Sequence, residues 1–296
     1  SHKQQVMAWV KDVADRAKRE GKVLSVFSHH PMMQFYRDSS RELATVFGKT
    51  GLDLTREPTS ATSEIAASTG IGLHFAGHIH ANDTAVYKKD GKFLVNVQVP
   101  SLAAYVPAYK QASYGTDGKV TVRTVRVADV PRFNDLFEHY REEHKTLSAK
   151  GSKGLWDVGI LSAKNYAEFA SWHITELTRL RFLERNWPCE MRQQVLSLNG
   201  ADMLTTALLD TSVTEAQLQQ AGKDKANLKA CTAGGKQTAD QKVVEQRYDA
   251  DWQAARDKAA RLAAANGLSL EALAKVRGLD LAIDFHRVLN AGELAF

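Results

Sequence analysis

The chain has no long apolar run and no concentrated block of positive charge. Because no uninterrupted apolar segment approaches the roughly 18–20 residues that a membrane-spanning helix needs, we expect no membrane span in these 296 residues. The formal net charge is +5, but lysine and arginine are interleaved with acidic residues throughout. A basic stripe of the kind that marks a nucleic-acid-binding surface is missing. We therefore expect no nucleic-acid partner, although the net charge suits an anionic ligand.

Cysteine is also scarce, since the chain contains only Cys189 and Cys231, without Cys-x-x-Cys spacing. The pair either forms a structural disulfide that closes a long loop, as in a periplasmic or secreted protein, or remains as two buried thiols. The sequence leaves both alternatives open, and with them the cellular location. The length is sufficient for a full hydrophobic core and for two domains.

The most informative stretch that is present runs from Gly77 to His80, with the sequence Gly-His-Ile-His. It follows the apolar run 71–76, which predicts a buried strand, and it precedes a polar turn. Two histidines at positions i and i+2 beyond a strand end can turn both imidazoles toward one point. Imidazole nitrogen binds Zn, Fe, Mn, Co or Ni at about 2.0–2.2 Å, and Gly77 leaves room for close approach of the backbone.

A second segment repeats this arrangement. Residues 23–27 predict a short buried strand, which ends at Ser28-His29-His30-Pro31, where the proline stops the ladder of hydrogen bonds. Ligands of α/β proteins bind at strand ends along one edge of the sheet. Two such endings about fifty residues apart therefore favour a common metal site over two unrelated loops.

Taken in order, these motifs resemble the C-terminal half of a calcineurin-like metallophosphoesterase. The match consists of His29-x-Pro31, the Gly77–His80 motif and the strand 96–102, which contains Asn, Pro and Ser. The opening helix, with Gln5 and Trp9, resembles the helix that precedes the first of these motifs in the family. The resemblance covers about residues 3–127, and it is the order of the motifs that makes it specific.

The resemblance implies a fold, an activity and a set of ligands. The fold is α/β (α+β), half of the family's αββα sandwich. The activity is that of a phosphatase or phosphodiesterase, in which two metal ions (Fe, Mn, Zn or Co) and a bridging hydroxide hydrolyse a phosphoester. His29 and His78 would ligate one ion and His80 the other. His30 would point the opposite way if the strand pleat persisted, as a catalytic residue that either supports a metal ligand or faces the substrate. The substrate, a phosphorylated small molecule or a phosphodiester, is not specified further.

The family also draws ligands from an N-terminal half, in the order Asp-x-His, Gly-Asp-x-x-Asp and Gly-Asn-His-Asp/Glu. This ordered set does not precede His29 here. Ser1-His2 looks like the remnant of a cleaved tag. We therefore expect this chain to be the C-terminal piece of a larger protein, with the missing half as its partner. On its own it would bind at most one metal ion weakly and would be nearly inactive.

Beyond the histidine motifs the pattern changes twice. Asp-Gly at 90–91 and at 117–118 lies between alternating segments and predicts two β-hairpins, the outer half of a sheet completed elsewhere. From Val130-Pro131 onward the periodicity is helical. We therefore expect residues 1–130 to belong to the metallophosphoesterase domain and residues 131–296 to form a separate α-helical domain.

Two further points remain open from the sequence. His74 lies inside a predicted strand and is expected to be packed or to lie at a sheet face, whereas His286 has Asp280 and Asp284 nearby and is expected on an ordinary polar helix face. The function also has an alternative. The helical domain could be the working part of a binding or scaffolding module, with a catalytically incomplete phosphoesterase half.

Overall fold

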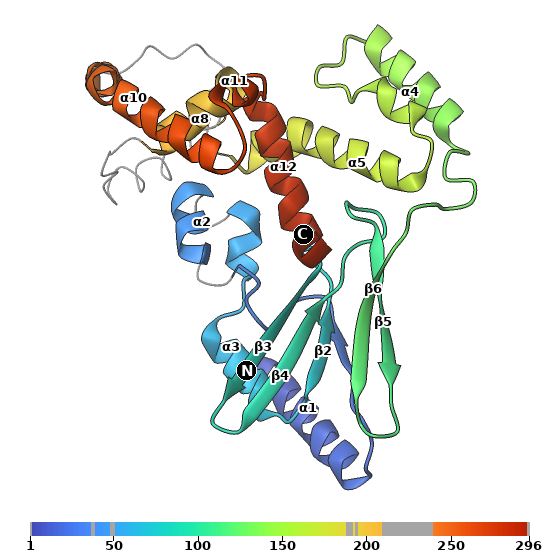
Figure 1. The fold of residues 1–296 in the computed structure, drawn as a ribbon. Coiled ribbons are helices and arrows are strands. Elements are labelled where there is room, and N and C mark those ends of the chain that lie inside the picture. The colour runs from blue at the N-terminus through green and yellow to red at the C-terminus, as the bar shows by residue number, and fades with distance from the viewer. Residues whose placement is uncertain are drawn as a thin grey trace. The chain divides into compact units, whose positions relative to one another are not determined.

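The computed structural model describes residues 2–36, 39–47, 51–187, 192, 195–208 and 239–294 (Figure 1). The protein is of mixed α/β class, about 52% helical and 16% strand, which confirms the predicted class, while the αββα sandwich stays a prediction. The chain divides into two compact units. Unit 1 comprises Ser1–Ser40, Asp53–Leu177 and His286–Phe296, and unit 2 comprises Arg41–Leu52 and Thr178–Phe285. The predicted division at residue 130 stays a prediction.

Unit 1 contains a four-stranded sheet in the order β1-β2-β4-β3. Strands β1 (Val26–Ser28), β2 (Leu73–Ala76) and β4 (Lys92–Gln98) are parallel, and β3 (Asp83–Lys89) is antiparallel to β4. The turn between β3 and β4 has positive φ at both Asp90 (51°) and Gly91 (73°). Asp-Gly suits such a turn because these residues tolerate the left-handed region, so the first predicted hairpin is confirmed.

Two helices pack against this sheet. Helix α1 (His2–Arg19) contributes Val10 and Ala14, and helix α3 (Ser60–Ser68) contributes Ala66 and Ala67, to one core cluster. The strands and loops complete this cluster with Met33, Ile71 and Leu94. Helix α3 begins at an N-cap, Thr59, whose side chain accepts a hydrogen bond from the backbone N–H of Thr62.

The prediction of a buried first strand is wrong in detail. Strand β1 begins at Val26 rather than at Val23, and the side chain of Phe27 is 72% exposed. The reason is its place in the sheet, because β1 lies at one edge and pairs with β2 on one side. Phe27 instead stacks on Phe75 of β2, with 5.2 Å between the ring centroids.

The second predicted hairpin is also confirmed, but the described strands place it in a sheet of its own. Strands β5 (Ala108–Tyr114) and β6 (Val120–Arg126) form a two-stranded antiparallel sheet. After it come helix α4 (Phe137–Ala149), the 3-10 helix η3 (Val158–Ser162) and helix α5 (Tyr166–Leu177). These three helices share a cluster built on Phe137, Ile160 and Leu161.

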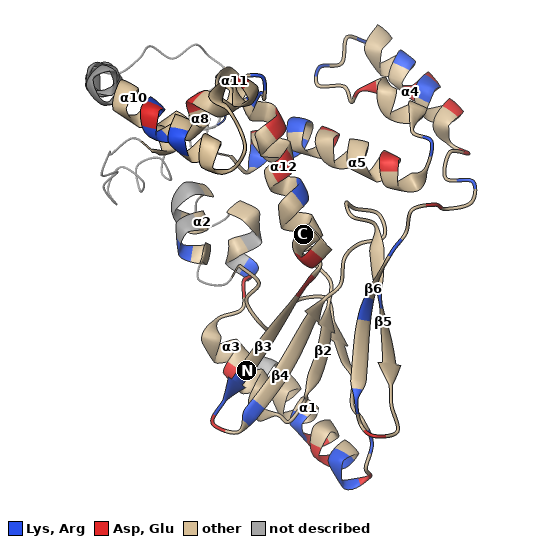
Figure 2. Ribbon diagram, in the orientation of Figure 1, with Lys and Arg blue, Asp and Glu red and all other residues tan. Residues whose placement is uncertain are grey.

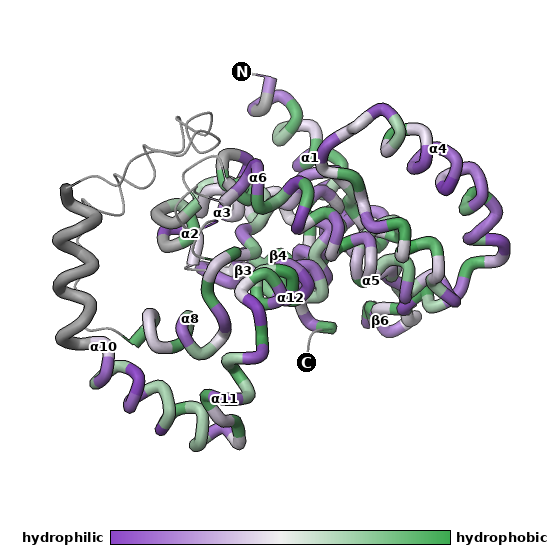
Figure 3. Tube along the Cα trace, turned by 90° about the horizontal axis from the view of Figure 1, so that it is seen from above, coloured by the Kyte–Doolittle hydropathy of each residue, from purple (hydrophilic) through white to green (hydrophobic). Residues whose placement is uncertain are grey.

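Helix α4 otherwise carries charge. Glu138 pairs with Arg141 and Glu142 with Lys145 along its exposed surface. Figure 2 shows both signs along α4, and Figure 3 shows that hydrophilic residues predominate in it. Such exposed pairs contribute little to stability. The cluster built on Phe137, Ile160 and Leu161 is therefore the main contact that stabilises the position of α4.

Unit 2 has a separate core. Phe47 of helix α2 (Ser40–Phe47) packs with Trp187 and with Phe285 of helix α12 (Gly278–Ala291). The other elements described between residues 178 and 277 are η4, a π-helix at Thr178–Phe182, and the α-helices α6 (Leu183–Arg185), α8 (Gly200–Ala207), α10 (Ala239–Ala265) and α11 (Leu270–Leu273). A further 3-10 helix, η2, spans Gly51–Arg56.

The last described residues return to unit 1. From His286 onward α12 belongs to unit 1, and it is followed by a short 3-10 helix, η7 (Gly292–Leu294). Among the described residues, no helix is both long and apolar enough to cross a membrane. Cys189 and Cys231, and with them the disulfide question, lie outside the described residues.

Candidate metal and phosphate site

Two parallel strands bring the predicted site residues together. Ser28 at the end of β1 is in register with Ala76 at the end of β2. The chain continues from these paired residues into His29 on one side and into Gly77-His78 on the other. Because parallel strands end at the same edge of a sheet, both histidine loops emerge there side by side.

The imidazoles of the two loops are in contact. Nε2 of His29 lies 3.2 Å from Nδ1 of His78. The ring centroids of these two residues are 5.1 Å apart, in an edge-on arrangement. His29 is exposed and His78 is half-buried, so the paired nitrogens lie near the surface, where a ligand could reach them.

His30 does not point away from this pair. Its ring centroid lies 4.2 Å from that of His78 and 5.1 Å from that of His29. The expected alternation required the strand pleat to continue, but β1 ends at Ser28. Oγ of Ser28 donates a hydrogen bond to the backbone carbonyl of His30 at 2.7 Å, which helps turn the chain, and all three rings then gather in one place.

The backbone of the Gly-His-Ile-His loop has an uncommon conformation. His78 and His80 have φ values of 67° and 57°, in the left-handed region that residues other than glycine rarely adopt. Residues held in this region cost free energy and cluster at functional sites. A Cβ at Gly77 would lie 3.7 Å from Nδ1 of His29, an ordinary contact. The packing on His29 therefore does not itself require glycine there.

The surroundings of His80, including His29, change the pKa of its imidazole. Its side chain reaches the surface, yet partial burial lowers the pKa of His80 below its ordinary value, and the positive charge of His29 lowers it further. Loss of water and a nearby like charge both disfavour the protonated imidazole. The neutral form, which is the one that binds a metal ion, is therefore favoured at His80.

Two buried amides hold the loops, and sequence reasoning did not assign them this role. Oδ1 of Asn96 accepts hydrogen bonds from the backbone N–H groups of Met32 (2.7 Å) and Met33 (3.2 Å), just beyond the first histidine loop. Nε2 of Gln98 donates to the carbonyl of Gly77 in the second loop. Both side chains are fully buried on β4. The only feature of the sequence that indicates this role is the presence of two polar residues, 96 and 98, on a strand in the interior of the sheet.

His74 is fully buried in β2, as the sequence predicted. Its Nε2 lies 2.8 Å from Oγ of Ser28, across the β1–β2 pair. Burial lowers the pKa of His74, and the neighbouring Asn96 partly offsets this effect. A neutral imidazole on β2 therefore contacts Ser28, the last residue of β1, which immediately precedes His29.

The geometry of the His29–His78 pair fits a common metal ion. In a tetrahedral site with metal–nitrogen distances of about 2.0–2.1 Å, two ligand nitrogens are about 3.3 Å apart. The observed separation of 3.2 Å is close to this value, and it is also the length of the hydrogen bond that the two nitrogens form with each other. Among the described residues, however, no group of three or more His, Cys, Asp and Glu side chains is arranged to hold an ion. The two-ion centre with His80 thus stays a prediction.

The sequence does contain one Asp-x-His triplet, at Asp284–His286, after the histidine motifs rather than before them. It lies within α12, and His286 is only 3% exposed. The prediction that His286 lies on an ordinary polar helix face is therefore wrong. Burial lowers the pKa of His286 to about 4, because the interior disfavours a charged imidazole.

No protein-family model matches the chain, and no curated protein sequence matches it.

Proposed function

We propose that this chain forms part of a metal-dependent phosphoester hydrolase of the calcineurin-like type. His29 and His78 would hold one ion of a two-metal centre, and His80 would contribute to the second. The observation that supports this most directly is the 3.2 Å approach of Nε2 of His29 to Nδ1 of His78 at adjacent strand ends. The order of the two histidine motifs along the chain and the spacing of the two ring nitrogens support the same assignment.

Each histidine has a separate part in this proposal. His29 and His78 bring two ring nitrogens to the distance that a shared ion requires. His30 lies against His78, where it would face the phosphate of a substrate. When bound, the metal ions would act as Lewis acids that activate water and neutralise the phosphate oxygens.

A neutral imidazole binds one ion through one nitrogen, so two ions are joined only by bridging ligands, such as carboxylates. In the family these come from the N-terminal motifs. We therefore expect the 296 residues to bind at most one equivalent of Zn²⁺ or Co²⁺, weakly, and to hydrolyse phosphoesters poorly. Fe and Mn remain candidates for the complete centre, since ligand type alone does not select among these metals.

Calorimetric titration of the purified chain with Zn²⁺ tests the assignment. His78→Ala should weaken binding more than about 10-fold, because a lost ligand costs at least as much as a lost supporting residue. His139→Ala is the matched control, since His139 is exposed on α4, and it should leave binding unchanged. Equal binding by all three proteins would refute the assignment.

Activity tests the second half of the proposal. Monoester and diester hydrolysis should be weak for the chain alone and should rise when a polypeptide with the Asp-x-His, Gly-Asp-x-x-Asp and Gly-Asn-His motifs is added. EDTA should abolish that gain. Strong EDTA-sensitive activity of the chain by itself would contradict the expected need for further ligands.

A further inference from the structure

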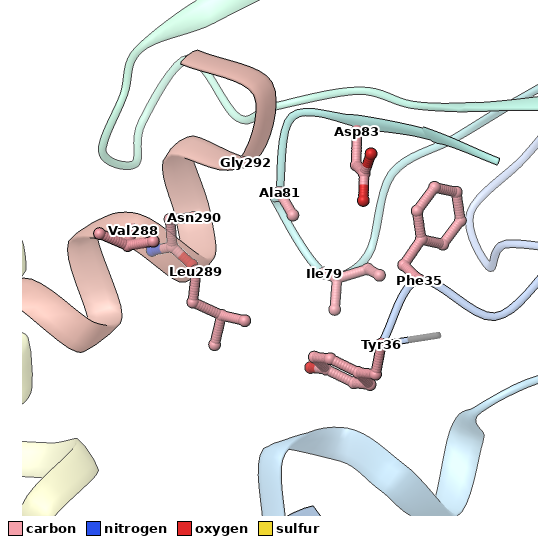
Figure 4. A pocket seen from close by; sticks show the side chains of 9 residues that line it. All are labelled: Phe35, Tyr36, Ile79, Ala81, Asp83, Val288, Leu289, Asn290 and Gly292. Atoms are coloured by element: carbon pink, nitrogen blue, oxygen red, sulfur yellow. The ribbon is translucent and has the colours of Figure 1, made fainter. Parts of the chain in front are cut away.

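A pocket of about 200 Å³ lies within unit 1, beside the histidine loops (Figure 4). Both loops that carry the histidines also line it. Phe35 and Tyr36 follow His30 in the chain, and Ile79 stands between His78 and His80. Figure 4 shows Ile79 facing the side chains of Tyr36 and Leu289. Because Ile79 is the chain neighbour of both His78 and His80, the loop that carries these two candidate ligands also forms part of the pocket wall.

The far wall of the pocket is the returning end of the chain, and it is firmly attached. The backbone N–H of Asn82 donates to the carbonyl of Asn290 at 3.2 Å, and the N–H of Glu293 donates to the carbonyl of Asn82 at 2.8 Å. Oγ1 of Thr124 donates to Oδ1 of Asn82 at 3.0 Å. The backbone N–H, the backbone carbonyl and the side-chain oxygen of the buried Asn82 are thus all hydrogen-bonded, so this wall of the pocket is already formed without a ligand.

An ion pair adds to this attachment. Nζ of Lys110 lies 3.7 Å from the carboxylate of Glu293, and the side chain of Lys110 is only 5% exposed. The same Nζ donates to Oγ1 of Thr124 at 2.8 Å. The wall that carries Leu289 is thus fixed to the β5–β6 sheet as well as to the histidine loop.

The lining of the pocket selects for a ligand group of a particular kind. It is mainly apolar, with two aromatic rings, and its one acidic side chain is Asp83. A carboxylate disfavours a second anionic group in this space. An apolar cavity of about 150 Å³ holds benzene in another protein, so about 200 Å³ accommodates a single six-membered ring.

We propose that this pocket receives the aromatic alcohol portion of a phosphoester whose phosphate lies at His29 and His78. This inference rests on the proposed hydrolase function and specifies its substrate class as aryl phosphates. In the reaction, the oxygen of water forms a bond to phosphorus and the bond from phosphorus to the aryl oxygen breaks. The electron pair leaves with that oxygen, which takes one proton from water, and the products are phosphate and phenol.

Phenol itself is the first probe, because its binding requires neither metal nor turnover. Ligand-observed NMR on the full chain should show saturable binding of phenol. Leu289→Trp, which fills the pocket, should weaken that binding at least about 10-fold, because hydrophobic pockets discriminate by such factors per added or missing group. Leu102→Trp is the matched control, since Leu102 is exposed and does not line the pocket.

A second variant protects the test against misfolding. Val288 lines the pocket but is half exposed, so Val288→Phe should fill the space while the chain folds normally. Absence of saturable phenol binding to the unaltered chain would overturn the inference. So would unchanged binding by both filled variants, or an equal loss in the Leu102→Trp control.

Hydrolysis assays separate this inference from the function on which it rests. With the added N-terminal polypeptide and metal, phenyl phosphate should be hydrolysed faster than methyl phosphate, and Val288→Phe should remove that preference. Phenol binding without hydrolysis of either ester would refute the proposed function. Hydrolysis of both esters at equal rates would refute the pocket's role and leave the hydrolase proposal intact.

Discussion

Replacing Asn96 by leucine should loosen the first histidine loop. The side chain is fully buried on β4, and its Oδ1 accepts the backbone N–H groups of Met32 and Met33. Leucine has a similar shape but no acceptor. A buried N–H group without a partner costs about 1–3 kcal/mol. Because the Met32 bond is only partly buried and water can replace it there, we expect a total loss of about 2–4 kcal/mol.

Hydrogen exchange is the appropriate assay, because a chain with two compact units need not unfold in a single transition. A local loss of about 2 kcal/mol corresponds to roughly 30-fold faster exchange at the amides of Met32 and Met33. The imidazole NMR signals of His29 should broaden or shift as its loop loosens. Exchange of the amides of α4 should change less, because the core cluster that contains this helix includes neither Asn96 nor the two methionines.

Asn165→Leu provides the control for this experiment. Oδ1 of Asn165 accepts a single backbone N–H, that of Glu168, near the start of α5. Its loss should cost about 1 kcal/mol, as for other helix caps, and should leave the exchange of Met32 and Met33 unchanged. If Asn96→Leu changes the exchange of these two amides less than twofold, the assigned role of Asn96 is wrong.

Two further predictions concern residues of α12 and η7. Because the pKa of His286 is lowered to about 4, the unfolded chain binds more protons between about pH 6.5 and pH 4. Stability should therefore fall by about 3 kcal/mol over that range as pH decreases. Urea titrations of His286→Phe should show no such loss of stability at low pH. The same pH dependence in His286→Phe and in the unaltered chain would refute this prediction. Gly292→Ala should destabilise the returning segment by about 1–3 kcal/mol, since φ is +49° and a Cβ would collide with the carbonyl oxygen of Asn82. Thermal melts of both variants test this, and Gly72→Ala, where a Cβ meets nothing within 4 Å, should be neutral in them.

Local patterns predicted local structure well. The Asp90-Gly91 pair correctly predicted the first hairpin, and the apolar run before Gly-His-Ile-His correctly predicted where β2 ends. Both signals act over a few residues, where backbone preference and side-chain alternation decide the conformation. The meeting of His29 with His78 followed from a general rule about parallel strand ends rather than from either motif alone.

Features that depend on distant neighbours were missed. The sequence could not show that β1 lies at a sheet edge, so Phe27 was expected to be buried and is exposed. Similarly, the partners of Asn96 lie more than sixty residues away along the chain. His286 appeared polar because of nearby aspartates in sequence, whereas its burial is set by what packs around α12. Such features require the tertiary structure.

The two walls of the pocket are separated by a long interval of synthesis. Ile79 and Asp83 lie on one side, and Gly292 lies on the other, 209 residues later. At about 5–20 residues per second, a ribosome needs roughly 10–40 s to cover that distance. During this time the histidine loops have already been made, but the pocket beside them has only one wall. A nascent chain would thus expose the candidate ligands His29, His78 and His80 well before the second wall of the pocket is made.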